Sequence, residues 1–117
     1  MALRAAHPLL PSWYEPKGHE GEGVRFKLKG LNPAGLFDVN AHSISDGKNV
    51  KFPATAIRSA LAVGLLGWEG FLEESGAAVP FSSDVDASME RLGFGLSAEL
   101  FGEIVAMSNL SGEQAKN

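Results

Sequence analysis

The sequence contains no cysteine, no long hydrophobic run and no excess of positive charge, and each absence excludes a class of protein. Without cysteine, the 117-residue chain has no disulfide scaffold, no thiolate metal site and no cysteine nucleophile. No apolar stretch approaches the roughly 20 residues that a membrane-spanning helix needs. Lysine and arginine total 10 against 14 aspartates and glutamates, a formal net charge of −4. Because nucleic-acid binding needs a concentrated positive surface, we expect neither nucleic acid nor membrane as a partner.

The length of the chain predicts one domain. A chain of 117 residues is long enough for one core and too short for two. Pro8 and Pro11 interrupt the N-terminal apolar segment, so it lacks the hydrophobic run of a signal peptide. We therefore expect a cytoplasmic protein with a flexible N-terminal arm (residues 1–12), one globular domain (residues 13–111) and a frayed C-terminal tail (residues 112–117).

Apolar and basic residues alternate strictly over residues 24–29, which read VRFKLK. Such alternation predicts a half-buried strand with apolar side chains on one face and basic side chains on the other. The preceding segment, PKGHEGEG, predicts a turn that allows residues 12–15 to pair back as the other arm of a β-hairpin. Because a lone hairpin is only marginally stable in water, its apolar face must rest on helices.

Capping residues mark the helices predicted in the middle of the chain. Asn32 and Pro33 suit the start of a short helix that ends near residue 40. A clearer helix opens at Pro53 with apolar residues at helical spacing, and Gly67 is placed to end it. Between the two, residues 42–49 are predicted to be a loop and residues 48–52 a brief extended piece.

The C-terminal third predicts two further helices. Ser83 and Asp86 have the spacing of a capping box and open a short helix to about Leu92. Gly93 and Gly95 break that helix, and the last helix begins two residues later. The sequence thus predicts a small, mainly helical α+β domain in which an N-terminal β-hairpin packs on three to four helices.

The histidines give little support for a metal site. His7, His19 and His42 lie in separate predicted loops, without the spacing of a metal-binding pair. His19 with Glu20 and Glu22 is the one cluster that could hold a cation, but the surrounding glycines argue against a preformed site. Surface histidines are the simpler interpretation, and we expect no metal and no other cofactor.

Two patterns that suggest catalysis have structural explanations. Asp84 and Asp86 could form an acid pair, but two residues apart on a helix they point in different directions, and capping explains their position. Residues 93–98 (GFGLSA) match the loose dinucleotide pattern G-x-G-x-x-A, yet no strand precedes them and too little chain follows for a βαβ unit. We predict no catalytic residues and a protein that is not an enzyme.

The basic stripe of Arg25, Lys27 and Lys29 and the aromatic residue Trp68 each allow two interpretations. The stripe could contact phosphate, although three cations on a strand more often keep it soluble. Trp68, between Gly67 and Gly70, could fill the core or anchor a partner. The candidate partner-binding residues are Trp68, Phe71 and the apolar stripe of the last helix, Leu100, Phe101, Ile104 and Val105.

The order of several short motifs resembles the tail assembly chaperones of long-tailed bacteriophages and related prophages. The motifs are Lys29-Gly30-Leu31 after the strand, Gly67-Trp68-Glu69-Gly70, Val79-Pro80-Phe81-Ser82, and a last helix that runs from Ser108 into the terminal Lys116-Asn117. The resemblance covers residues 24–117, and it is the order of the motifs and the small size of the chain that carry it.

The resemblance implies a non-enzymatic protein of the bacterial host cytoplasm that is absent from the mature virion. Such proteins bind the tape measure protein, keep its long apolar helices from aggregating, help recruit tail tube subunits and self-associate. The alternative is another small phage-encoded binding protein that inhibits a host or defence protein. A third class, a small metal-dependent or hydrolytic enzyme, would depend on His19 or on Asp84 and Asp86.

Overall fold

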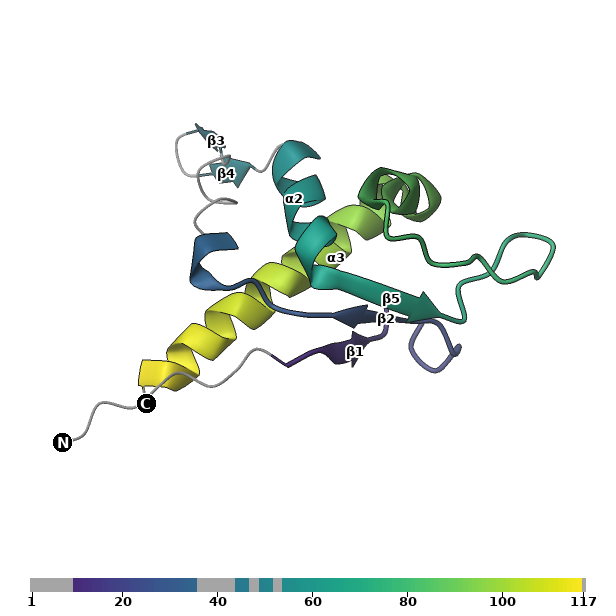
Figure 1. The fold of residues 1–117 in the computed structure, drawn as a ribbon, viewed down its shortest axis with the longest axis horizontal. Coiled ribbons are helices and arrows are strands. Elements are labelled where there is room, and N and C mark those ends of the chain that lie inside the picture. The colour runs from purple at the N-terminus through teal and green to yellow at the C-terminus, as the bar shows by residue number, and fades with distance from the viewer. Residues whose placement is uncertain (1–9, 36–43, 47–48, 52–53, 117) are drawn as a thin grey trace.

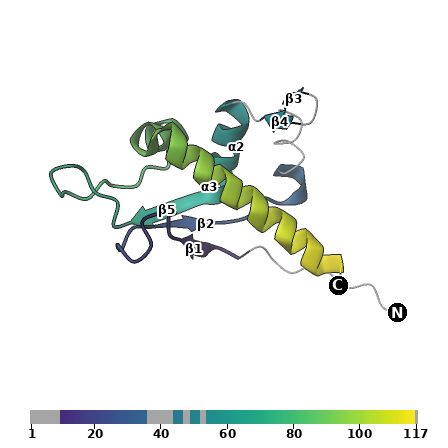
Figure 2. The ribbon, with the colours of Figure 1, turned by 180° about the vertical axis from the view of Figure 1, so that it is seen from behind.

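The computed structural model describes residues 10–35, 44–46, 49–51 and 54–116. Three antiparallel strands form the main sheet in the order β1-β2-β5, and the long helix α3 crosses one face of it, with α2 against α3 (Figures 1 and 2). The elements are β1 Ser12–Tyr14, β2 Arg25–Leu28, β3 Ile44–Asp46, β4 Asn49–Lys51, α2 Ala54–Gly64, β5 Leu65–Glu69 and α3 Val85–Lys116. The α+β class predicted from the sequence is confirmed.

The predicted N-terminal hairpin is present, and its second strand is the centre of the sheet. β1 pairs with β2 so that Tyr14 lies opposite Phe26, and β5 pairs on the other side so that Trp68 also lies opposite Phe26. Phe26 and Leu28 are fully buried, whereas Arg25 and Lys27 between and beside them are only half-buried. The alternation in the sequence therefore separates an apolar inner face from a basic outer face.

The end of α2 was predicted wrongly, and the error hid a strand. The helix ends at Gly64 rather than Gly67, and residues 65–69 form β5. The exposed edge of β2 needs hydrogen-bond partners, which β5 supplies, and the backbone N–H of Lys29 donates to the carbonyl of Gly64 at 2.9 Å. Trp68 thus lies on a strand and not in a turn after a helix.

Gly64 allows α2, β2 and α3 to meet closely. A Cβ atom at this position would lie 2.7 Å from Cδ1 of Ile104 and 2.9 Å from the carbonyl oxygen of Lys29. Ile104 is on α3 and is fully buried. The missing side chain therefore permits the junction between helix and strand to rest directly on α3.

The predicted capping box at the start of α3 is displaced by one residue. The cap is Asp84, whose Oδ1 accepts a hydrogen bond from the backbone N–H of Asp86 at 3.0 Å, and not Ser83. The Asp86 carboxylate instead accepts two hydrogen bonds from Arg58 on α2, at 2.7 and 3.1 Å, which lower its pKa. The capping explanation holds for Asp84, while Asp86 ties the two helices together.

The predicted break at Gly93 is confirmed, since this residue has φ +78° and ψ 169° within α3. The second predicted break at Gly95 is wrong, because the helix has already resumed there, and Ser97 lies inside it. The helix continues to Lys116, beyond residue 112 where the tail was expected to begin. The domain limits at residues 13 and 111 stay predictions.

Two predictions for the middle of the chain can also be compared with the structure. The backbone N–H of Gly35 donates to Oδ1 of Asn32 at 2.8 Å, which confirms the predicted cap. β3 and β4 pair as a separate two-stranded antiparallel sheet. β4 confirms the extended piece predicted over residues 48–52, whereas the loop predicted over residues 42–49 is wrong where β3 forms. His7 and His42 lie outside the described residues.

The core lies between the sheet, α2 and α3. Its buried apolar members come from every one of these elements and from the segment after β2: Phe26, Leu28, Leu31, Ala56, Ile57, Ala60, Leu61, Leu65, Leu92, Leu100, Phe101 and Ile104. In the part of the chain that the structure describes, no helix is long and apolar enough to cross a membrane.

Two buried serines of α3 differ in how their hydroxyl groups are satisfied. Ser108 accepts a hydrogen bond from the backbone N–H of Leu31 at 2.6 Å and donates one to the carbonyl of Ile104 at 2.8 Å. Ser97, which is 1% exposed, has no hydrogen-bond partner for its hydroxyl among the described residues. A buried polar group without a partner costs stability, whereas a paired one does not.

We therefore expect opposite effects from the same substitution at these two positions. Ser97→Ala should raise the free energy of unfolding by about 1 kcal/mol, and Ser108→Ala should lower it by about 1–3 kcal/mol because the N–H of Leu31 loses its acceptor. Chemical denaturation of both variants beside the wild type measures the difference. A loss of stability in Ser97→Ala equal to that in Ser108→Ala would contradict this assignment.

Candidate functional site

Four aromatic rings form a cluster that runs from the core to the surface; we refer to Phe26, Trp68, Phe71 and Phe81 as the aromatic cluster. Their neighbouring ring centroids are 5.0 to 6.0 Å apart, all in edge-to-face arrangements. The indole N–H of Trp68 donates to the carbonyl of Val79 at 2.7 Å. Exposure rises from 0% at Phe26 to 37% at Phe81, so the cluster connects the core with an apolar surface.

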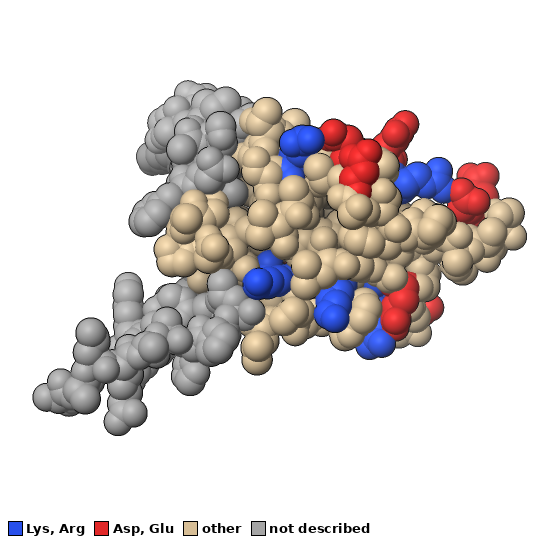
Figure 3. Space-filling model, in the orientation of Figure 1, with Lys and Arg blue, Asp and Glu red and all other residues tan. Residues whose placement is uncertain are grey.

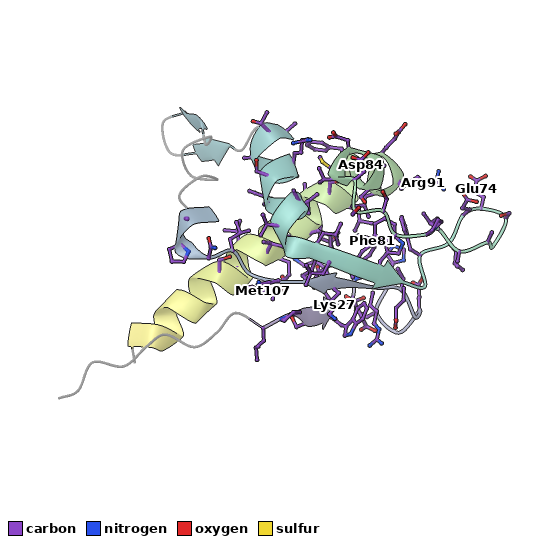
Figure 4. All side chains as sticks on the ribbon, viewed as in Figure 1. Lys27, Glu74, Phe81, Asp84, Arg91 and Met107 are labelled. Carbon is purple, nitrogen blue, oxygen red and sulfur yellow. The ribbon has the colours of Figure 1, made fainter. Side chains whose placement is uncertain are left out.

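The segment after β5, residues 70–79, folds back on itself as a narrow loop that we call the finger. The backbone N–H of Val79 donates to the carbonyl of Phe71 at 2.8 Å, and the N–H of Glu73 to that of Ala77 at 2.8 Å. It projects from the sheet at the opposite end of the molecule from the C-terminal end of α3 (Figure 1). Glu73 in the finger forms an ion pair with Arg91 of α3, and Figure 4 labels Arg91 and the neighbouring Glu74.

Only glycine fits at the base of the finger. Gly70 has φ +71°, and a Cβ there would lie 2.2 Å from the carbonyl oxygen of Gly23. The finger and the turn of the hairpin therefore approach each other backbone to backbone. This contact forms one wall of the space described next.

A pocket of about 450 Å³ opens between the β1–β2 turn, the start of the finger and α3. Its apolar lining comes from β2, the finger and α3, and its polar lining comes from the turn and from Glu99 of α3. The residues are Pro16, Lys17, His19, Glu22, Val24, Phe26, Gly70, Phe71, Leu72, Leu96 and Glu99. The volume lies within the roughly 300–1,000 Å³ range of small-ligand pockets, and the lining is mixed.

Glu99 holds the hairpin onto α3. Its Oε2 accepts a hydrogen bond from the hydroxyl of Tyr14 at 2.6 Å and one from the backbone N–H of Lys17 at 2.9 Å. Burial of Tyr14, together with this hydrogen bond and the negative charge of Glu99, raises the pKa of the phenol well above its ordinary value. Sequence patterns gave no sign of this contact, because the two side chains are 85 positions apart.

Glu20 and Glu22 of the β1–β2 turn each contact a nearby residue of the same turn. Nδ1 of His19 lies 3.2 Å from a carboxylate oxygen of Glu22, and Glu20 accepts a hydrogen bond from the backbone N–H of Gly18 at 3.0 Å. Across the described residues, no group of three or more histidine, cysteine and acidic side chains is arranged to hold a metal ion. The predicted His19 cluster is therefore a set of exposed local contacts.

The outer face of the sheet carries the basic stripe. The guanidinium carbon of Arg25 lies 4.4 Å from the ring centroid of Trp13, and Nζ of Lys27 lies 6.0 Å from it. Arg25 also forms an ion pair with Glu69 of β5. Figure 3 shows basic side chains along the sheet side of the molecule, and Figure 4 places Lys27 there. These cations stack and pair within the protein, which favours the solubility interpretation of the stripe.

The structure separates the predicted partner-binding residues into two groups. Trp68 and Phe71 are half-buried members of the aromatic cluster. Leu100, Phe101 and Ile104 lie in the core, and Val105 packs against it from α3. In this fold a partner could reach Leu100, Phe101 and Ile104 only if the helix moved, whereas Val105 is half-buried.

Several large apolar side chains that the sequence did not single out are exposed. The largest exposed fractions belong to Phe94 at 80%, Leu10 at 72%, Leu72 at 55% and Val63 at 54%. Phe94 follows the break at Gly93, so a helical wheel drawn through the break misplaces it. In the sequence, its position between Gly93 and Gly95 was the one feature that could have suggested an exposed aromatic residue.

Comparison with known proteins returned no match: no protein-family model, no curated protein and no solved structure matches this chain. The site is therefore argued from its own residues. Its central features are the aromatic cluster, the finger and the pocket that Glu99 helps to line.

The contact between Tyr14 and Glu99 can be tested by titration, because Tyr14 is the single tyrosine of the chain. Phenolate absorbance should rise at a pH well above the ordinary tyrosine pKa of 10.0. Because the folded-state pKa exceeds that of the unfolded chain, the contact stabilises the fold below about pH 10 and is lost as the pH rises further.

Glu99→Gln removes the charge but keeps an oxygen that can accept both hydrogen bonds. We expect the absorbance transition of this variant to move toward pH 10, with circular dichroism at each pH showing that the chain is still folded. An unchanged transition in Glu99→Gln would contradict the assignment.

Proposed function

We propose that this protein is a non-enzymatic tail assembly chaperone of a long-tailed phage or prophage. In this role it binds the tape measure protein and helps recruit tail tube subunits during tail morphogenesis. Support comes from the order of the motifs Lys29-Gly30-Leu31, Gly67-Trp68-Glu69-Gly70 and Val79-Pro80-Phe81-Ser82 in the sequence. The proposal includes a location in the bacterial host cytoplasm, self-association, and release before the virion is complete.

The observation that carries the proposal is that these motifs contact one another in the fold. The indole N–H of Trp68 donates to the carbonyl of Val79, which joins the second motif to the third. The first motif contacts the start of the last one, because the N–H of Leu31 donates to Ser108 and a Cβ on Gly30 would lie 3.2 Å from the nitrogen of Ser108. The motifs thus contact one another in two pairs, the second with the third and the first with the start of the last.

Exposed apolar side chains give a physical basis for binding an aggregation-prone partner. Phe94, next to the break in α3, and Leu72, in the finger, present large apolar side chains to solvent. A protein that covers long apolar helices needs such groups on its surface before the partner arrives. Phe94 and Leu72 replace the buried Leu100, Phe101 and Ile104 as the proposed contact residues.

The test is co-expression with the tape measure protein encoded in the same genome. We expect the tape measure protein to move from the insoluble to the soluble fraction and to co-purify with this chain. Failure of the wild-type chain to solubilise it would contradict the proposal. Co-purification of a host or defence protein in its place would favour the alternative, an inhibitor.

Surface variants sharpen the same experiment. Phe94→Ser should reduce solubilisation and leave the melting temperature nearly unchanged, because the side chain is 80% exposed. Val63→Ser is the matched control, since it removes an exposed apolar side chain from α2 rather than from α3 or the finger. Equal loss in both variants would contradict the role of Phe94.

A further inference from the structure

We propose that the pocket between the β1–β2 turn, the finger and α3 binds a lysine or arginine side chain presented by a protein partner. The pocket has a volume of about 450 Å³ and opens to solvent. Of the two proposed contact residues, Leu72 lines the pocket and Phe94 does not. The occupant is inferred from the chemistry of the walls, taken in turn below.

The floor of the pocket is apolar and suits an aliphatic stem. Phe26 is a lining residue and is fully buried, and Phe71 packs edge-on against it with ring centroids 5.6 Å apart. Val24, Leu72 and Leu96 complete the apolar lining. Lysine and arginine carry three or four methylene groups below their charge, so such a floor can cover the stem while the charge stays at the mouth.

The mouth of the pocket is predominantly acidic. Its two acidic lining residues are Glu22 and Glu99. Glu20 and Glu103 do not line the pocket, although their charges act on Tyr14, the hydrogen-bond partner of Glu99. Lys17 is the one permanently charged cation among the lining residues that the structure describes, and His19 is paired with Glu22. The charge balance at the mouth therefore favours a cation.

Glu99 keeps one carboxylate oxygen for a ligand. Both of its hydrogen bonds, from Tyr14 and from the N–H of Lys17, go to Oε2, and no donor to Oε1 occurs among the described residues. These bonds fix the carboxylate against the pocket wall before a ligand arrives. A fixed carboxylate beside aromatic rings is a favourable environment for a guanidinium or ammonium group.

The basic residues of strand β2 itself do not neutralise this mouth. Because side chains alternate along β2, Phe26 faces the pocket while Arg25 and Lys27 face the other side of the sheet. Arg25 is held there by Trp13 and Glu69. The strand thus keeps positive charge on one face and leaves the acidic pocket on the other.

The inference rests on the proposed function in one respect, namely that the cation belongs to a protein partner. The pocket itself is tested without any tail protein, so the two can fail independently. The probe is n-hexylammonium, which has the charge of a lysine side chain on an alkyl stem two carbons longer, and hexanoate is the probe of opposite charge.

The measurement is a titration followed by ¹H–¹⁵N correlation spectra of the full chain. We expect saturable shifts with hexylammonium at the amides of Lys17, Glu22, Gly70 and Leu72, and none of comparable size with hexanoate. Equal shifts with both probes would show an apolar cavity without charge selection and would overturn the proposal. Shifts confined to other residues, or none at all, would overturn it as well.

Two variants separate charge from shape. The double variant Glu22→Gln with Glu99→Gln keeps side-chain oxygens that can accept the existing hydrogen bonds, and it should weaken hexylammonium binding by about fivefold. Glu90→Gln, an exposed glutamate of α3 outside the pocket lining, removes the same kind of charge and should leave binding within about twofold. Equal weakening in both would assign the effect to net charge and contradict the site. Well-dispersed spectra of the double variant establish that it is folded.

Discussion

The packing of Phe26 at the centre of the sheet is the contact on which the rest of the structure depends. This side chain is fully buried, lies opposite both Tyr14 and Trp68 in the strand register, and belongs to the core that α3 closes. Both edges of β2 must be paired for its backbone to be satisfied, so the burial of Phe26 brings β1 and β5 together. The close approach of Gly64 to Ile104 then lets α2 and α3 cover the same core.

The surface properties follow from the same strand. Alternation along β2 puts Arg25 and Lys27 on the outer face, where Trp13 and Glu69 engage them, and leaves the inner face to the aromatic cluster and the pocket. Glu99 joins the hairpin to α3 and at the same time supplies negative charge at the pocket mouth. β2 thus centres the sheet and contributes Phe26 to the pocket, while Glu99 of α3 supplies charge at its mouth.

Local signals allowed part of this fold to be predicted. The alternation over residues 24–29, the cap at Asn32 and the break at Gly93 each depend on neighbouring residues, and each is confirmed. β5 was missed because a short apolar run after a helix fits either structure, and only the open edge of β2 decides for a strand. The bond between Tyr14 and Glu99 and the exposure of Phe94 arise from tertiary packing, which a single sequence does not show.

The central claim is that Trp68 belongs to the structure first, as the ring that extends the Phe26 core to the surface. The most direct test is the free energy of unfolding of Trp68→Ala, measured beside Trp68→Phe. The claim predicts a loss of about 3 kcal/mol for the alanine variant, because three ring contacts and the bond to Val79 disappear together. Trp68→Phe keeps a ring and should lose clearly less. An alanine variant as stable as the wild type would contradict the claim and leave Trp68 as a residue that serves a partner alone.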